Sequence, residues 1–237
     1  MSISKLKVKI FADGAEKAGI LELNQNPAIT GFTTNPTLMA KVGIPDYEAF
    51  CRDLVAEIPD KPFSFEVFAD DFDEMERQAR NIGSWGSNVY VKLPITNTKN
   101  EFVGPIAKKL ASEGFKLNVT ALLTLAQVRD IVPCLEGTPS SYVSVFAGRV
   151  ADTGVDPLPL MMASVEMLKL NPNLELIWAS PRELLNIFQA DAIGCHIITV
   201  THDTLKKLSL VGKDLTEYSL DTVKMFYNDG LKAGFKI

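Results

Sequence analysis

Short runs of apolar and β-branched residues recur along the whole chain, and most are separated by stretches whose apolar positions have helical spacing. Eight runs are predicted to be strands: residues 8–12, 29–33, 63–68, 89–93, 117–122, 142–146, 175–179 and 197–200. Alternating strands and helices indicate a parallel sheet, and eight strands are typical of a (β/α)8 (TIM) barrel. The same alternation also permits an open doubly wound sheet, which is the chief alternative.

The stretches between the strands carry apolar stripes that predict the covering helices. In residues 47–58, apolar side chains lie on one face, with Glu48, Arg52 and Glu57 outside it. The same kind of pattern predicts helices over residues 73–82, 105–112, 125–135, 158–170, 182–188 and 219–233. Residues 152–159 form a loop rich in Gly and Pro, and no linker is apparent. A chain of 237 residues therefore fits one barrel domain over residues 1–237.

Composition and charge narrow the class of protein. With 46% hydrophobic and 22% charged residues and a net charge of -5, the chain is globular and has no basic surface for nucleic acid or anionic membrane. No apolar run approaches the roughly 18 residues of a membrane helix, and the opening sequence MSISKLKVKI does not resemble a signal peptide. Three cysteines without a CxxC pair suit a reducing compartment, so we expect a cytoplasmic protein.

Motifs for metals and nucleotides are missing from the sequence. The two histidines, His196 and His202, lack the spacing of a helical zinc pair, and we interpret them as structural. No Gly-rich GxGxxG or Walker-type loop is present, so neither a dinucleotide nor a nucleoside triphosphate is indicated.

Polar residues occupy the ends of seven predicted strands. In a parallel barrel, residues two apart share a face, and the catalytic groups gather at the C-terminal strand ends. An ordinary core would keep these positions aliphatic, because burying an unpartnered polar group costs on the order of 1 to 3 kcal/mol. The candidates for one shared site are Asp13, Thr34, Asn35, Glu66, Lys92, Asn118, Thr120, Ser144, Phe146, Arg149, Ser180 and Arg182.

Lys92 is the candidate nucleophile, since it lies between Val91 and Leu93 at a predicted strand end. Partial burial there favours the neutral amine, which can add to a ketone and form an iminium that withdraws electrons from the neighbouring C–C bond. A lysine that extends to solvent is the alternative. Asp13, Glu66 and Thr120 are placed to move protons around an imine. Each has a structural alternative: Asp13 as a helix N-cap, Glu66 as an ion-pair partner of Lys92, and Thr120 as a β-former.

Arg149, Ser180 and Arg182 form a candidate phosphate site, because two guanidinium groups, a hydroxyl and the start of the next helix all favour a dianion. Ser180 as an N-cap with Pro181 at the first helical position is an adequate structural explanation. A surface salt bridge is the alternative for each arginine.

Five segments together resemble the short form of the transaldolase family. They are GFTTNPTLMA (31–40), VKLPIT (91–96), NVT (118–120), SVFAGR (144–149) and ASPR (179–182), and the match spans nearly the whole chain in the family's order. The resemblance implies a class I aldolase barrel with its Schiff-base lysine on the fourth strand, at Lys92. It implies that Asp13 is the general acid/base for C–C cleavage, and that Glu66 and Thr120 position water and shuttle protons.

The resemblance also implies how a substrate is held. Asn35, Asn118 and Ser144 would bind the hydroxyls of a dihydroxyacetone unit, with Thr34 and Phe146 completing the substrate site. The phosphate would contact Arg149, Ser180 and Arg182. No cofactor and no metal are implied. The expected partners are small sugar phosphates, and the family's rings with exchanged C-terminal helices predict a homo-oligomer, a pentamer or a decamer.

Two positions favour a transaldolase over the fructose-6-phosphate aldolases of the same branch. The aldolase type resembles a site with Gln in place of Glu66 and Tyr in place of Phe146. The predicted reaction transfers dihydroxyacetone from sedoheptulose 7-phosphate or fructose 6-phosphate to an aldose phosphate. The alternatives are aldolase cleavage that releases dihydroxyacetone, a sugar with a different anionic group, and a non-catalytic barrel that binds phosphosugars. Asp13-Gly14-Ala15 departs from the family's Asp-Thr-Ala, and Phe146-Ala-Gly-Arg149 from its Phe-Val-Gly-Arg.

Overall fold

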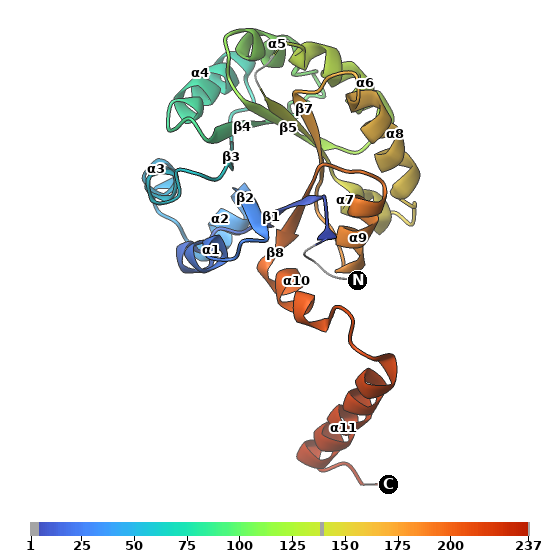
Figure 1. Cartoon of the computed structure of the whole chain (residues 1–237). Helices are drawn as coiled ribbons and strands as arrows, with labels where there is room; N and C mark the ends of the chain where they lie inside the picture. The colour runs from blue at the N-terminus through green and yellow to red at the C-terminus, as the bar shows by residue number, and fades with distance from the viewer. Residues whose placement is uncertain (1–4, 138–139, 237) are drawn as a thin grey trace.

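The eight predicted strands form a closed parallel barrel in chain order (Figure 1). The computed structural model describes residues 5–137 and 140–236, so the first residues of the predicted N-terminal segment, 1–4, lie outside the described residues. The strands are β1 (Lys9–Asp13), β2 (Ile29–Thr33), β3 (Phe63–Glu66), β4 (Val89–Pro94), β5 (Leu117–Leu122), β6 (Ser141–Val145), β7 (Leu174–Trp178) and β8 (Ile197–Thr201). Because β1 pairs with both β2 and β8, the sheet has no edge. The prediction of a (β/α)8 barrel is confirmed, and the open sheet is excluded.

Helices follow the strands, and most of them cover the outside of the barrel (Figure 1). They are α1 (Lys17–Asn24), α2 (Pro36–Val42), α3 (Tyr47–Glu57), α4 (Phe72–Gly83), α5 (Gly104–Ser112), α6 (Leu125–Ile131), α7 (Ala147–Asp152), α8 (Leu158–Leu168), α9 (Leu185–Ala192), α10 (His202–Lys206) and α11 (Leu215–Ala233). The predicted helix over 125–135 divides, because Pro133 cannot continue the α-helical hydrogen bonds and the chain turns into a 3-10 helix, Val132–Leu135. Four short helices, α1, α2, α7 and α10, were not predicted.

The barrel interior is apolar toward the N-terminal ends of the strands and polar toward their C-terminal ends. Nearer the N-terminal ends of the strands, a separate buried cluster fills the interior with Phe11, Tyr90, Tyr142, Ile177 and Ile197, and its sixth member, Ala179, follows the C-terminal end of β7. The rings of Tyr90 and Tyr142 stack with centroids 4.0 Å apart. Gly31 makes room for Phe11, since a Cβ at Gly31 would lie 2.6 Å from that ring. Two residues further along, the same inward faces carry polar side chains, because strand residues alternate between faces.

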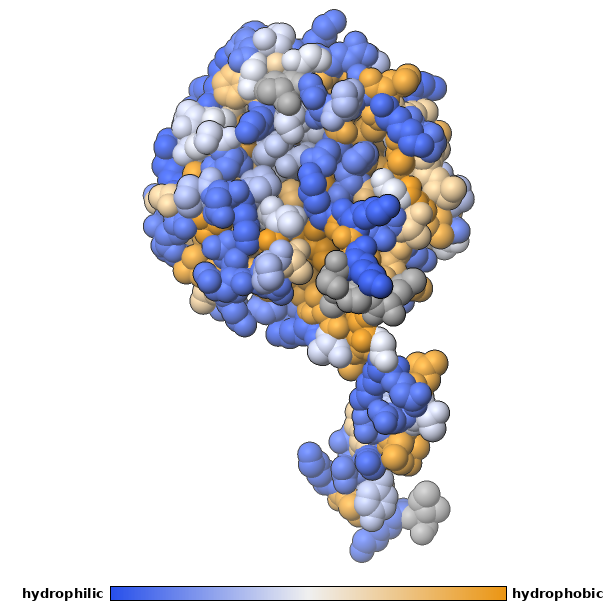
Figure 2. Space-filling view, viewed as in Figure 1, coloured by the Kyte–Doolittle hydropathy of each residue, from blue (hydrophilic) through white to orange (hydrophobic). Residues whose placement is uncertain are grey.

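The last helix, α11, projects away from the barrel (Figure 1). Asp214 caps its start by accepting hydrogen bonds from the backbone of Thr216 and Glu217, so the helix begins four residues before the predicted 219. None of its residues is buried, and apolar side chains lie on its visible surface (Figure 2). Among the described residues, no helix has the length and apolar character needed to cross a membrane.

Candidate active site

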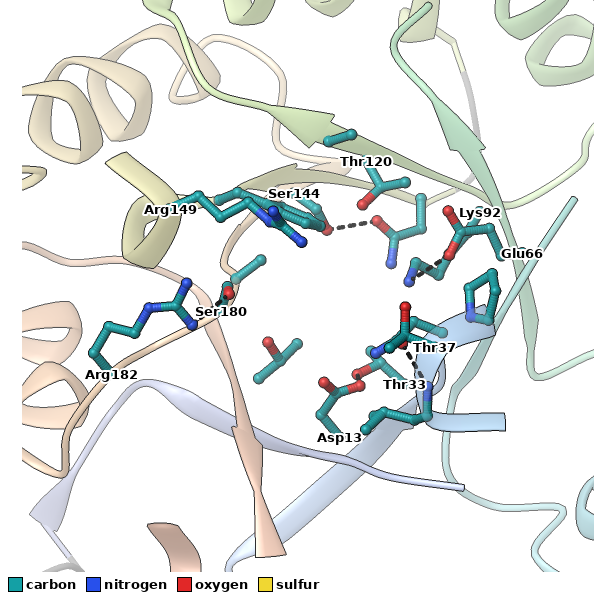
Figure 3. Close-up of a pocket in the computed structure, with 18 residues that line it drawn as sticks. Asp13, Thr33, Thr37, Glu66, Lys92, Thr120, Ser144, Arg149, Ser180 and Arg182 are labelled. Carbon is teal, nitrogen blue, oxygen red and sulfur yellow. Dashed lines mark hydrogen bonds and ion pairs between the residues drawn. The ribbon is translucent and has the colours of Figure 1, made fainter. Parts of the chain in front are cut away.

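A pocket of about 460 Å³ opens at the C-terminal ends of the strands, where the polar parts of the inward faces meet (Figure 3). Eleven of the twelve predicted site residues line it, and Thr34 is the exception. The lining consists of Asp13, Thr33, Asn35, Pro36, Thr37, Leu38, Glu66, Lys92, Asn118, Thr120, Ala121, Ser144, Phe146, Arg149, Ala179, Ser180, Arg182 and Thr199. The barrel therefore brings residues from all eight strands, or from the loops that follow them, to one cavity.

Lys92 lies on β4 with only 7% of its surface exposed, so the amine does not extend to solvent as the alternative proposed. Its Nζ donates a hydrogen bond to the Thr34 carbonyl oxygen at 2.9 Å and lies 3.2 Å from Oε2 of Glu66. Glu66 is its neighbour because the register of β3 and β4 pairs these two residues. A buried ammonium requires such partners, since desolvation without them is costly. The predicted ion pair between Glu66 and Lys92 is confirmed.

Asp13, at the end of β1, is the second carboxylate of the pocket. Thr33 Oγ1 donates a hydrogen bond to its Oδ1 at 2.9 Å. Burial raises the pKa of Asp13, and the nearby charge of Lys92 and the Thr33 hydrogen bond oppose that rise. The alternative of Asp13 as an N-cap is wrong: α1 begins at Lys17 with Glu16 as its cap residue, because residues 14–16 first lead the chain out of the barrel. Asp13 is left free to face the pocket.

Thr120 presents a hydroxyl that has no partner among the described residues. The residue is 1% exposed, and its Oγ1 is buried without a hydrogen bond. Figure 3 shows the side chain directed into the cavity. The next residue, Ala121, has a positive φ of 65°, at an irregularity in the pairing of β5 with β6. A left-handed backbone at a non-glycine residue is strained, and such strain is concentrated at functional sites.

Several amides and hydroxyls of the pocket already have hydrogen-bond partners. Ser144 Oγ donates to Asn118 Oδ1 at 2.6 Å, and Asn118 Nδ2 donates to Ser64 Oγ at 3.0 Å. Asn35 caps α2, because its Oδ1 accepts a hydrogen bond from Leu38 N at 3.0 Å. These bonds fix the side chains before a substrate enters.

Thr34 lies outside the pocket lining, although it was predicted to bind substrate. Its hydroxyl donates to the Ser64 carbonyl at 3.5 Å, and its own carbonyl accepts the Lys92 hydrogen bond. Three lining threonines were not predicted: Thr33, Thr37 and Thr199. The alternation rule could have found two of them, since Thr33 follows Gly31 and Thr199 follows Ile197 at a spacing of two. Thr37 lies on α2, a helix that the sequence pattern did not predict.

The far end of the pocket carries two arginines that are exposed. Arg149, on α7, places its guanidinium over the Phe146 ring with 5.7 Å between Cζ and the ring centroid. Among the residues that the structure describes, no carboxylate lies within 4 Å of that guanidinium. Arg182 forms a two-bond ion pair with Asp152, in which its Nε donates at 2.8 Å. The salt-bridge alternative is therefore confirmed for Arg182, which nevertheless donates from Nη1 to Ser180 Oγ at 3.1 Å.

Ser180 has a positive φ of 61° and does not begin a helix. The prediction of an N-cap at Ser180 is wrong, because α9 begins only at Leu185, and the predicted helix start at 182 is wrong for the same reason. The strained turn brings the Ser180 carbonyl against α7. A Cβ at Gly148 would lie 1.5 Å from that oxygen, so only glycine permits this approach.

In the described part of the chain, no group of three or more His, Cys, Asp or Glu side chains is placed to hold a metal ion. His196 accepts a hydrogen bond from Leu176 N on Nδ1 at 3.0 Å, and burial lowers its pKa. His196 therefore serves the packing of β7 against β8.

The fold and the pocket define the class of protein as a (β/α)8 barrel with its polar site at the C-terminal strand ends, the position of the active site in barrel enzymes. A family model described as "Transaldolase/Fructose-6-phosphate aldolase" matches residues 10–237. The chain belongs to this family, as its motifs indicated.

Individual relatives agree with the family match. A probable transaldolase from Thermoanaerobacter sp. (strain X514) is 34% identical, with 97% of this chain and all of that protein covered. A probable transaldolase from Dehalococcoides mccartyi is 35% identical over 85% of this chain and 90% of that one. Among solved structures, 3-keto-L-gulonate-6-phosphate decarboxylase from Vibrio cholerae has a TM-score of 0.56 at 13% identity, covering 82% of this chain and 88% of that chain. This last similarity concerns the fold alone.

Proposed function

We propose that this protein is a transaldolase that transfers a dihydroxyacetone unit through a Schiff base on Lys92. The donor would be a ketose phosphate, sedoheptulose 7-phosphate or fructose 6-phosphate, and the acceptor an aldose phosphate such as erythrose 4-phosphate. The family match and the probable transaldolases among the relatives support this reaction class. The observation that carries the proposal is the buried Lys92 amine, 3.2 Å from Glu66 in a pocket that also holds Asp13.

The first half of the proposed reaction makes the imine. The Lys92 ammonium passes a proton to Glu66 and the free amine attacks the ketone carbon of the donor. A C–N bond forms, and the carbonyl oxygen becomes a hydroxyl by taking up the proton that the attacking nitrogen releases. That hydroxyl then leaves as water, with a proton supplied by the Glu66 carboxyl. The Thr120 hydroxyl, which has no partner among the described residues, is available to bind the departing water. The product is an iminium, which is the electron sink for the next step.

The second half breaks and remakes a C–C bond. Asp13 takes the proton of the hydroxyl at the carbon beyond the bond to be broken, the bond electrons move into the iminium, and an aldose phosphate leaves. Lys92 then carries the three-carbon unit as an enamine. The enamine attacks the aldehyde of the acceptor, whose oxygen recovers the proton from Asp13, and water hydrolyses the new iminium. A carboxyl whose pKa is raised by burial is suited to exchanging that proton.

The exposed arginines would bind the phosphate at the other end of the sugar. Arg149 and Arg182 both line the pocket on the side opposite Lys92, and Ser180 lies next to Arg182 (Figure 3). Arginine donates in a planar fork that matches phosphate oxygens. Asp152 binds Nε and Nη2 of Arg182, and the remaining nitrogen, Nη1, is directed toward Ser180 in the pocket lining.

Borohydride trapping tests the covalent step directly. Fructose 6-phosphate and borohydride are added together, and the digested protein is analysed by peptide mass spectrometry. We expect a reduced adduct with the mass of dihydroxyacetone or of the whole ketose on Lys92. A protein that binds the sugar phosphate without a trapped adduct would be a non-catalytic binding barrel, and the proposal would be abandoned.

Kinetics with and without an acceptor separate a transaldolase from an aldolase. Glu66 and Phe146 offer a carboxylate and an apolar ring near the enamine, and the described lining of the pocket includes no phenol hydroxyl that could protonate it. We therefore expect fructose 6-phosphate to be consumed quickly only when erythrose 4-phosphate is present. Rapid release of free dihydroxyacetone without an acceptor would favour aldolase cleavage. Replacing the phosphate of the donor by a sulfonate tests the alternative anion.

We also propose that the protein is a homo-oligomer in which α11 packs against a second copy of the chain. Its apolar residues are exposed: Leu215, Tyr218, Leu220, Val223, Met225, Phe226, Tyr227 and Leu231. An apolar surface of this kind on a helix that projects from its own barrel is typical of a subunit interface. Light scattering should give the mass of a multimer, and Phe226→Lys should lower that mass. A stable monomer for the unchanged chain would contradict the proposal.

A further inference from the structure

A tyrosine on the outside of the barrel reaches the backbone of a site carboxylate. Tyr47 is the first residue of α3, and its hydroxyl accepts a hydrogen bond from Glu66 N at 3.0 Å. The same hydroxyl donates to the Glu66 carbonyl oxygen at 3.3 Å. Glu66 is the last residue of β3, so both backbone groups of this residue are satisfied by a side chain rather than by a strand.

The topology explains why a side chain is needed there. On one side, β3 is bonded to β4, where Val67 N donates to the Lys92 carbonyl at 3.1 Å. Successive residues of a parallel strand direct their backbone groups to opposite neighbours, so those of Glu66 face β2. But β2 ends at Thr33, and the last bond between the two segments runs from Thr34 N to the Ser64 carbonyl. The Tyr47 hydroxyl takes the place of the missing strand residue.

Aromatic packing fixes the position of this hydroxyl. The Tyr47 ring meets the edge of Phe68 with centroids 4.6 Å apart and that of Trp85 with centroids 5.9 Å apart. Burial raises the pKa of Tyr47 well above its usual range, so the hydroxyl keeps its proton and can donate and accept at once. The end of β3 is therefore anchored to a ring that is itself held by α3 and its neighbours.

We propose that Tyr47 is a positioning residue that sets the placement of the Glu66 carboxylate against the Lys92 amine. The inference rests on the proposed Schiff-base function. Glu66 contributes both its backbone to Tyr47 and its carboxylate to Lys92, so a small shift of the strand end moves the carboxylate directly. Misplacement of a reacting group by about 1 Å can cost about 100-fold in rate. We expect the loss of one supporting hydrogen bond to move the carboxylate by less than that. We expect about a 10-fold effect on the chemical step.

The test compares Tyr47→Phe with Tyr90→Phe as a matched control. Tyr90 is a buried tyrosine on β4, the strand of Lys92, and its hydroxyl bonds to Ser140 at 2.9 Å at the opposite end of the barrel. The measurements are the single-turnover rate of borohydride trapping at Lys92, kcat, KM and the melting temperature. Tyr47→Phe should lower the trapping rate and kcat about 10-fold with KM within about twofold. Tyr90→Phe should keep the wild-type rates.

A double-mutant cycle separates positioning from general loss of structure. In a Glu66→Ala background there is no carboxylate to position, so Tyr47→Phe should change the residual rate by less than about twofold. The same 10-fold loss in both backgrounds, or unchanged rates in Tyr47→Phe alone, would overturn the role of Tyr47. An unchanged chain that gives no adduct at Lys92 would instead remove the proposed function, and the role of Tyr47 with it.

Discussion

The two ends of the pocket hold their charges in different ways. At the lysine end, Lys92, Glu66 and Asp13 project from strands, and the Lys92 side chain is 8% exposed. At the arginine end, Arg149 and Arg182 follow the strand ends, and the Arg182 side chain is 45% exposed. The first set is packed into the barrel mouth, and the second set remains in contact with water.

This difference in burial indicates that the two ends of the pocket have different functions. A charge moved out of water is costly unless it is paired, and its protonation then depends on its neighbours. The buried set is therefore suited to covalent and proton-transfer chemistry, whereas exposed guanidinium groups keep most of their hydration and can bind and release an anion. Changes at the two ends should consequently affect different measured quantities.

The largest effect is expected from removing the Lys92 amine. Lys92→Met keeps the length of the side chain without a nucleophile, and turnover should fall by about 10^4-fold or more. Lys61→Met is the control, because Lys61 also donates from Nζ to a backbone carbonyl, that of Asn24 at 2.8 Å, but precedes β3 at the other end of the barrel. Steady-state rates of Lys92→Met close to those of the unchanged protein would refute the Schiff-base mechanism.

A smaller loss of activity is expected from Thr120→Val, and the stability of the fold should not fall. The buried Oγ1 of Thr120 has no described partner, and replacing it with a methyl group of similar shape removes an unsatisfied polar atom. kcat should fall about 100-fold if the hydroxyl serves proton transfer. The melting temperature should stay equal or rise. A lower melting temperature would mean that the hydroxyl serves the fold, and the role in catalysis would be withdrawn.

The next prediction concerns the arginine end of the pocket, where a substitution should change KM. Arg149→Gln should raise KM for fructose 6-phosphate by about 10- to 100-fold, because a charge-assisted hydrogen bond contributes about 1.5 to 3 kcal/mol. Activity on free fructose should change much less, since that sugar has no phosphate. Arg129→Gln serves as the control, because Arg129 is exposed on α6 and pairs only with Asp130 in the described structure. Equal losses of activity on both sugars would mean that Arg149 does not bind the phosphate.

The strands and the lysine end could be predicted from the sequence because both depend on short-range periodicity. Alternation within each strand places Lys92 two residues after Tyr90, and the closed barrel then brings strand ends together. The same rule applied to β8 would have added Thr199. Once the strands are located, the alternation of their residues therefore predicts most of the buried side chains at the lysine end.

The arginine end depends on loops, where the sequence says less. Ser180-Pro181 has the composition of a helix start, yet the backbone at Ser180 is left-handed and its carbonyl lies against Gly148, a residue more than 30 positions earlier. The pairing of Arg182 with Asp152 likewise joins α7 to the loop after β7. Tyr47 belongs to an apolar stripe that predicts only core packing. Its hydrogen bond to the Glu66 backbone arises because β2 ends before it reaches Glu66, and no local sequence pattern predicts that strand end.

The smallest effect, and the sharpest comparison of the two ends, is expected from removing one aspartate charge at each end. Burial raises the pKa of Asp13, so between its usual value of 3.8 and the raised value the folded chain binds more protons than the unfolded chain. Stability is therefore lost as the pH rises through that window. Asp13→Asn should melt about 2 to 4 °C above the unchanged protein at pH 7, and the difference should close near pH 4.

For Asp152→Asn, the change in melting temperature should depend on pH in the opposite way. The Arg182 guanidinium lowers the pKa of Asp152, so the unfolded chain binds more protons and the carboxylate stabilises the fold above its usual value of 3.8. Its contribution is lost as the pH falls, and Asp152→Asn should melt slightly below the unchanged protein at pH 7. Melting curves of the two variants from pH 3.5 to 8 measure both signs at once. Two variants that shift in the same direction would mean that the ends of the pocket do not differ in how burial acts on their charges.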